Sequence, residues 1–163
     1  MIVLGIDPGS RVTGYAAITR KAGRFHLLEA GTIRTNPKKD IPTRLLTIFT
    51  QLDDLIENLA PDSAAIESIF RYKSSESALR LGQARGVALV ALAKHGLQVT
   101  DYNPMTVKKS VGGHGRTGKD EMIRMVTRLL GLSKDLPSDA ADAAAIAIAH
   151  LIHSAFQARV PKR

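Results

Sequence analysis

Alternating and continuous apolar segments along the chain predict five strands. The segments are residues 2–6, 15–19, 25–33, 63–66 and 98–102. The first is a short apolar run that ends at a turn sequence, which is typical of a strand buried on both faces. A glycine-containing hairpin at residues 21–24 joins the second and third strands, so the first three strands predict an antiparallel meander.

Apolar residues at helical spacing predict the remaining elements. Four helices are expected, over residues 45–59, 74–94, 122–130 and about 138–159. Ser138 is the expected N-cap of the last helix, and Gly96 and Gly131 end the second and third. Because crossover connections are right-handed, the strand at 63–66 should lie parallel to the strand at 2–6. The order of elements therefore predicts an α/β fold, a mixed five-stranded sheet flanked by helices.

Composition excludes several classes of protein. The 163 residues are 44% hydrophobic, which suits a single domain over residues 1–163. The chain has no cysteine, so disulfides, zinc–thiolate sites and thiol nucleophiles are excluded, and a reducing cytoplasm is the expected compartment. The N-terminus lacks the features of a signal peptide, and Asp142 and His150 interrupt the most apolar later segment, so no membrane span is expected.

The chain is strongly basic. Its 23 Lys and Arg against 15 Asp and Glu give a formal net charge of +8, which suits nucleic acid, although high charge can also serve solubility alone. Six basic residues lie near candidate site loops: Arg71, Lys73, Lys108, Lys109, Arg116 and Lys119. Their clustering favours contacts with DNA phosphates.

Four carboxylates are candidates for one site. Asp7 and Glu67 each follow a predicted strand, and if those strands are parallel neighbours the two acids emerge about 5 Å apart at one sheet edge. Asp139 and Asp142 are three residues apart in the first turn of the last helix, so they share a face. If that turn docks over the same edge, four acids meet, and such hard oxygen ligands select Mg²⁺ or Mn²⁺.

Each acid also has an ordinary explanation. Asp7 can be a turn residue, and the two aspartates can complement the helix dipole. Glu67 is harder to explain in this way, because an acid without a function is more often found further into a loop. His150 and His153 lie on roughly the same stripe, but His150 is about 16 Å along the helix from Asp139, too far to share an ion. Both histidines are interpreted as ordinary polar helix residues.

Residues 113–120 almost match the phosphate-binding pattern GxxxxGK[ST]. Asp120 replaces the hydroxyl that would hold magnesium, and its charge would repel a triphosphate. A basic loop that touches DNA phosphates is the better interpretation, with Lys119 as a possible cation at the cleavage site.

Four segments closely resemble the RuvC family of Holliday junction resolvases: GIDPGSRVTGYA, AIESIF, SALRLGQARGVAL and SDAADAAAIAIAH. Each motif alone is common, but the four in this order and spacing are highly specific, and the similarity runs across nearly the whole chain. The resemblance implies an RNase H-like fold, which agrees with the predicted strand order.

The resemblance also implies roles for individual residues. Asp7, Glu67, Asp139 and Asp142 would be the metal-binding catalytic acids, Lys108 and Lys119 would lie near the scissile phosphate, and Phe70 would contact bases at the junction centre. At the position of the fourth acid, which is Asp142 in this chain, related sequences can have a histidine. The family resemblance further implies a homodimer that works with the RuvA and RuvB branch-migration proteins.

The segment after Glu67 interleaves aromatic and basic residues: Phe70, Arg71, Tyr72 and Lys73. It is expected to contact the junction, with an aromatic ring stacked on an unpaired base and the basic side chains on phosphates. A buried core position for Phe70 is the alternative. Lys109 and Arg116 are further candidate DNA contacts.

These features predict a magnesium-dependent endonuclease. Two Mg²⁺ ions, about 4 Å apart, would activate water and stabilise the leaving 3′ oxygen. By family resemblance, cleavage leaves a 5′ phosphate, and a two-fold dimer makes paired nicks in strands of like polarity. Three alternatives stay open: a phosphotransferase of the sugar kinase and actin group, a non-catalytic junction-binding protein, and a nuclease that processes ribosomal RNA.

Overall fold

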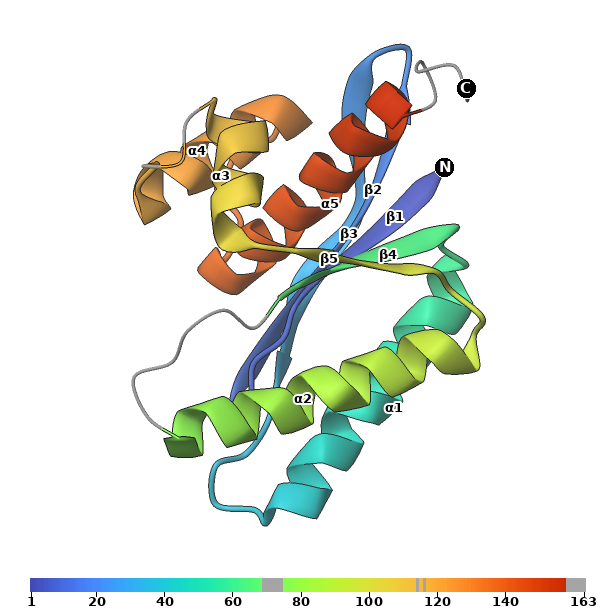
Figure 1. Ribbon diagram of the computed structural model, residues 1–163, viewed down its shortest axis with the longest axis vertical. Coiled ribbons are helices and arrows are strands. Elements are labelled where there is room, and N and C mark those ends of the chain that lie inside the picture. The colour runs from blue at the N-terminus through green and yellow to red at the C-terminus, as the bar shows by residue number, and fades with distance from the viewer. Residues whose placement is uncertain (69–74, 114, 116, 158–163) are drawn as a thin grey trace.

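A five-stranded sheet forms the centre of the molecule. The computed structural model describes residues 1–68, 75–113, 115 and 117–157 (Figure 1). The strands are β1 (Ile2–Asp7), β2 (Val12–Lys21), β3 (Arg24–Arg34), β4 (Ser63–Glu67) and β5 (Val99–Tyr102). Their spatial order is β3-β2-β1-β4-β5, with β1–β2 and β2–β3 antiparallel and β1–β4 and β4–β5 parallel. The predicted mixed five-stranded sheet is confirmed.

The strands at the meander are longer than the apolar pattern predicted. β2 extends to Val12 at one end and to Arg20 and Lys21 at the other, and these residues continue the pairing with β3. The predicted hairpin turns on Ala22 and Gly23, whose φ values of 48° and 80° are both positive. Two successive positive φ angles are what a tight two-residue hairpin requires, because they match the twist of the strands.

Five helices accompany the sheet in the described residues. They are α1 (Ile41–Leu59), α2 (Ser75–Lys94), α3 (Pro104–Gly112), α4 (Lys119–Leu130) and α5 (Ser138–Gln157). α1 begins four residues earlier than predicted, because Asp40 caps it by accepting a hydrogen bond from Thr43 N at 3.2 Å. The sequence prediction missed α3, whose nine residues are too few for a clear apolar period.

The N-terminus of α5 corrects one expectation. Ser138 is not the N-cap, because the helix already includes it and Pro137 O accepts the hydrogen bond from Ala141 N at 2.8 Å. The Ser138 hydroxyl is buried and has no hydrogen-bond partner among the described residues. Polar residue type alone therefore misplaced the cap by one position.

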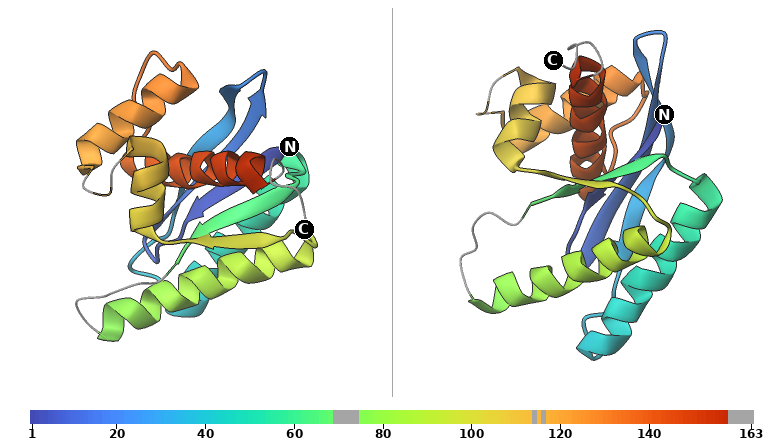
Figure 2. Two further views of the ribbon diagram at one scale, coloured as in Figure 1. Left: turned by 45° about the horizontal axis from the view of Figure 1, so that its top comes forward. Right: turned by 45° about the vertical axis from the view of Figure 1, so that its right-hand side comes forward.

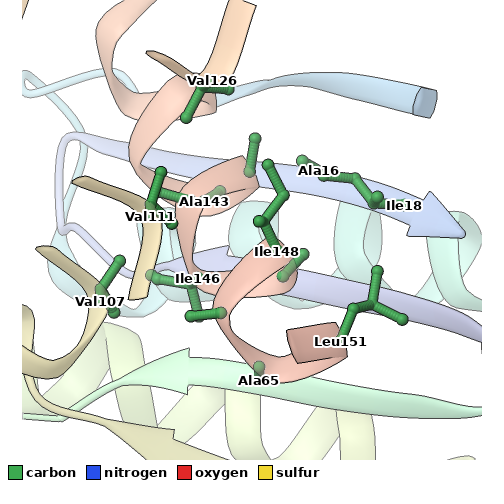
Figure 3. Close-up of a cluster of buried hydrophobic side chains, with 14 of the residues drawn as sticks. Ala16, Ile18, Ala65, Val107, Val111, Val126, Ala143, Ile146, Ile148 and Leu151 are labelled. Atoms are coloured by element: carbon green, nitrogen blue, oxygen red, sulfur yellow. The ribbon is translucent and has the colours of Figure 1, made fainter. Parts of the chain in front are cut away.

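Helices cover both faces of the sheet. α1 and α2 lie on one face, and α5 lies on the other with α3 and α4 beside it (Figures 1 and 2). Successive side chains of β1 point to opposite faces of the sheet. Val3 packs in the core under α5, whereas Leu4 and Ile6 pack in the core under α1 and α2. Figure 3 shows the first core, with Ile146 and Ile148 of α5 among side chains from the sheet, α3 and α4.

The last helix lies unusually close to the sheet. A Cβ built on Gly5 would stand 2.1 Å from Ala143 O, and one built on Gly14 would stand 1.9 Å from Asp139 O. Only glycine at these two positions lets α5 approach so closely. The described part of the chain contains no helix long and apolar enough to cross a membrane.

Candidate active site

Asp7 and Glu67 lie side by side where two parallel strands end. In the register of β1 and β4, Ile6 pairs with Ile66, so the next residue of each strand is one of these acids. Both carboxyl groups are partly buried, and a side-chain hydrogen bond joins them. The predicted pairing of the two acids at one sheet edge is therefore what the structure has.

The pair is short of positive charge. Burial, followed by the charges of Glu67, Asp142 and Asp139, raises the pKa of Asp7 from 3.8 to about 8. Burial and the charge of Asp142 also raise the pKa of Glu67, although its hydrogen bond with Asp7 and the charge of Lys119 oppose this. Both shifts favour a proton shared by the pair, which lies in the hydrogen bond between the two carboxyl groups. One proton holds together two groups that would otherwise repel each other.

The N-terminal end of α5 supplies the other two acids, Asp139 in its first turn and Asp142 just after it. Asp142 lines the same cavity as Asp7 and Glu67. Burial raises the pKa of Asp142, and the positive charge of Lys119 opposes the rise. Asp139 does not line the cavity, but its charge contributes to the raised pKa values of Asp7 and Asp142.

Two lysines face these carboxylates. Lys119, the first residue of α4, has its Nζ 3.5 Å from Asp142 Oδ2. Lys108 comes from α3 and lies close enough to lower the pKa of Asp142. The cavity that these groups share has a volume of about 200 Å³. It is lined by Asp7, Glu67, Pro104, Val107, Lys108, Gly118, Lys119, Met122, Asp142, Ala145 and Ile146.

The acids are not a preformed metal centre. Across residues 1–68, 75–113, 115 and 117–157, no group of three or more His, Cys, Asp or Glu side chains is already arranged to hold an ion. Asp7 instead bonds Glu67, and Asp142 pairs with Lys119. Their hard oxygen donors and their mutual repulsion nevertheless fit a divalent cation, which would replace the shared proton and relieve the repulsion.

The described N-terminus of α4 is poorly suited to a nucleotide. Gly118 is the N-cap of α4 without a side-chain cap, and Asp120 and Glu121 lie in the first turn. Two acids at this helix end oppose a triphosphate, as the sequence indicated for Asp120. Lys119 points its charge to Asp142, which fits the predicted cation at the site.

Most of the predicted DNA contacts belong to two segments of the chain. Phe70, Arg71, Tyr72, Lys73 and Arg116 lie outside the described residues. Lys109 is exposed on α3 and does not line the cavity.

The sequence prediction missed the wall of the cavity that α3 forms. Pro104 and Val107 belong to this wall. A signal was present, because Asn103 before a proline predicts a helix start, and Asn103 Oδ1 accepts a hydrogen bond from Met105 N at 2.7 Å. Gly113, with a φ of 76°, ends the helix.

The two histidines of α5 bind hydroxyl groups. His150 lies 3.2 Å from Tyr102 Oη and 3.4 Å from Ser63 Oγ, and His153 lies 2.8 Å from Ser110 Oγ. These contacts connect α5 to α3, to β4 and to the edge strand β5. The histidines do not line the cavity of the acids, in agreement with the distance argument from the sequence.

Comparison with known proteins finds relatives that share one family name. The family described as "Crossover junction endodeoxyribonuclease RuvC" matches residues 3–150. A protein of that name from Moorella thermoacetica is 44% identical over 160 residues, which covers 98% of this chain and 96% of the relative. Another from Haemophilus influenzae is 48% identical over 149 residues, covering 91% and 78%.

Solved structures of Holliday junction resolvases are similar to this chain. Thermus thermophilus RuvC in complex with Holliday junction substrate is 34% identical, with a TM-score of 0.92 and coverage of 96% of each chain. The yeast mitochondrial Holliday junction resolvase Ydc2, at 16% identity and a TM-score of 0.70 over 94% of this chain and 78% of that one, shows a shared fold.

Proposed function

The chain belongs to the RuvC family of crossover junction endodeoxyribonucleases, and we propose that it cuts four-way DNA junctions with the acids at the ends of β1 and β4. One observation carries the proposal. The carboxyl groups of Asp7 and Glu67 share a partly buried cavity with Asp142 and two lysines. Acids and cations converging on one cavity suit hydrolysis of a phosphodiester better than binding alone.

We propose Mg²⁺ as the cofactor, with Mn²⁺ as a possible substitute. Asp7, Glu67, Asp139 and Asp142 would hold the metal, since they offer only hard oxygen donors. When bound, two such ions supply activation of a water molecule and stabilisation of the leaving 3′ oxygen. The pKa of Asp7, which burial and then the charges of Glu67, Asp142 and Asp139 raise to about 8, supports this fit, because a bound cation would offset the repulsion among these carboxylates.

The residues of the chain itself bind and orient the substrate. Lys119 and Lys108 stand on the side of the cavity made by α4 and α3, opposite the sheet acids. Their charges suit a non-bridging oxygen of the scissile phosphate. A phosphate there would draw Lys119 from Asp142, and that carboxylate would become available as a ligand.

Junction DNA is the proposed substrate. The related protein from Thermus thermophilus has been solved with a Holliday junction substrate, and its coverage of this chain is 96%. The formal net charge of +8 supports binding to a polyanion. A DNA substrate of this kind makes the cytoplasm the proposed compartment, and the cut is proposed to leave a 5′ phosphate.

We further propose a homodimer that makes paired nicks in strands of like polarity. Leu79 and Val90 of α2 are 64% and 59% exposed, and both lie on the outer layer of the molecule. Apolar side chains so exposed on one helix are suited to a second copy of the chain. RuvA and RuvB are proposed as partners from the family resemblance alone.

A substrate comparison tests the proposal against its alternatives. The assay incubates the protein and Mg²⁺ with a four-way junction, a linear duplex of the same sequence and a structured RNA. Cutting of the junction alone supports the proposal. Preference for the RNA would favour a ribosomal RNA nuclease, binding of the junction without cutting would favour a non-catalytic protein, and ATP binding by calorimetry would favour the phosphotransferase.

A further inference from the structure

The turn that follows Asp7 is held by hydrogen bonds from inside the molecule. Gly9 N donates to Thr13 Oγ1 at 3.3 Å, and Thr13 Oγ1 donates back to Gly9 O at 2.9 Å. Thr13 is fully buried. A Cβ on Gly9 would stand 2.1 Å from Val12 O, so the turn has little room to change its shape.

A second set of contacts holds the other half of the turn. Thr35, just beyond β3, donates from Oγ1 to Ser10 O at 2.7 Å and from its backbone N to Arg11 O at 3.0 Å. The turn is therefore bonded on one side to β2 and on the other to the end of β3. Thr35 is itself 7% exposed.

Arg44 completes this set of contacts from α1. Its side chain is only 4% exposed, its Nη2 donates to Ser10 O, and its Nε donates to Thr35 Oγ1 at 3.1 Å. Among the described residues no carboxylate forms an ion pair with it. All its observed partners are uncharged oxygens that belong to the turn or support it.

Burying a cation without a carboxylate partner lowers the stability of a fold, because the charge loses its hydration. Apolar side chains of similar volume often stabilise a fold as well or better, because they avoid the desolvation of the charge. Ile48 and Leu52, one and two turns further along α1, are fully buried in this way. An arginine at this position therefore calls for a reason other than filling space.

We propose that Arg44 is a positioning residue for the reaction, which fixes the turn after β1 and thereby the direction of the Asp7 carboxyl group. The proposal rests on the proposed function. Ser10 O, the atom that Arg44 and Thr35 share, lies three residues after Asp7. A planar guanidinium that bonds two oxygens at once fixes direction as well as distance. Misplacement of a catalytic group by about 1 Å can cost about 100-fold in rate.

The test uses three substitutions. Arg44→Met keeps an apolar stem without charge, Arg44→Lys keeps the charge without the fork, and Thr35→Val removes the hydroxyl at nearly constant volume. Leu52→Ala is the control, because it destabilises α1 in the core without touching the turn. Each protein is studied well below its melting temperature.

Three readouts separate positioning from stability. The first is the junction nicking rate at saturating Mg²⁺, and the second is Mg²⁺ binding by calorimetry. The third is hydrogen exchange of the Gly9 and Thr35 amides, which donate to Thr13 Oγ1 and Arg11 O in the turn. Arg44→Met and Thr35→Val are expected to lower the nicking rate about ten-fold or more. Both should also weaken Mg²⁺ binding and speed hydrogen exchange of the two amides. Arg44→Lys should be intermediate between these variants and the wild type in all three readouts. Junction affinity in Ca²⁺ stays within about two-fold.

The Leu52→Ala control distinguishes a loss of positioning from a loss of stability. Leu52→Ala should lower the melting temperature while the rate, Mg²⁺ binding and the two amides remain as in the wild type. The proposal is wrong if both turn variants bind Mg²⁺ and cut normally once folded, or if Leu52→Ala shows the same losses. If Arg44→Met does not fold, Thr35→Val alone carries the test. If the wild type cuts no junction, the proposed function fails, whereas exchange and Mg²⁺ binding still report on Arg44.

Discussion

Gly14 lies directly beneath the backbone carbonyl of Asp139, so that a Cβ on Gly14 would stand 1.9 Å from that oxygen. Gly14 is also the register partner of Asp7 across β1 and β2. A single glycine thus sets how close the first turn of α5 comes to the end of β1. This approach brings the aspartates of α5 to the acids of the sheet.

Gly14→Ala should push the first turn of α5 away from the sheet. We expect a lower melting temperature and weaker Mg²⁺ binding, because the backbone carbonyl of Asp139 cannot yield as a flexible side chain would. Gly82→Ala on α2 is the control, since a Cβ there meets nothing within 4 Å. Equal Mg²⁺ affinity in the Gly14 variant and the wild type would show that the close approach does not position the acids.

The stability of the metal-free protein should depend on pH through Asp7. Its pKa of about 8 in the folded protein exceeds its ordinary value of 3.8. Between these values the folded state keeps a proton that the unfolded chain has lost. The contribution of this group is therefore fully present below 3.8 and is lost as the pH rises through about 8.

Thermal melts in EDTA from about pH 5 to about pH 9 measure this dependence, with Asp7→Asn as the reference. The melting temperature of the wild type should fall relative to the variant as the pH rises. Mg²⁺ binding should strengthen over the same range, because the metal competes with the proton. A constant difference between the two proteins across the range would show that Asp7 has no raised pKa.

Asp142→Asn should separate metal binding from stability. Removing one charge from a repulsive group leaves metal-free stability unchanged or slightly raised, although the pair with Lys119 at 3.5 Å is lost. Mg²⁺ binding should weaken, as measured by melts with and without the metal. A large loss of stability in EDTA would instead make Asp142 a structural residue of the α5 N-terminus.

The proposed dimer predicts different effects for two equally exposed leucines. Leu79 on α2 and Leu46 on α1 are 64% and 63% exposed. Leu79→Glu should shift sedimentation at micromolar concentration towards the monomer and reduce paired nicking, whereas Leu46→Glu should do neither. A wild-type monomer that still makes paired nicks would show that this face of α2 is not a dimer interface.

The sequence was enough to predict the strands and the pairing of Asp7 with Glu67. Both follow from local patterns, since short buried strands are continuous apolar runs and parallel neighbours end at one edge. The RNase H-like arrangement came from the family resemblance and agrees with the solved relatives. The N-cap of α5 was wrong by one residue and the start of α1 by four, because caps depend on backbone geometry.

Other features required the structure. The approach of α5 through Gly5 and Gly14 depends on contacts between segments far apart in sequence, which no local pattern contains. The same holds for Arg44, which lies just before the predicted helix of residues 45–59 and has no evident role until its contact with Ser10 is known. The prediction that Phe70 stacks on a junction base stays a prediction, since that residue lies outside the described part of the chain.

Junction cleavage by acid-to-amide variants measures whether the carboxylates of the cavity carry out the reaction. Wild type, Asp7→Asn, Glu67→Gln and Asp139→Asn are compared on one four-way junction in Mg²⁺, and binding is measured separately in Ca²⁺. We expect paired nicks by the wild type and no detectable nicking by any variant, with junction binding retained by all four. Full cleavage by a folded Asp7→Asn or Glu67→Gln protein would contradict it.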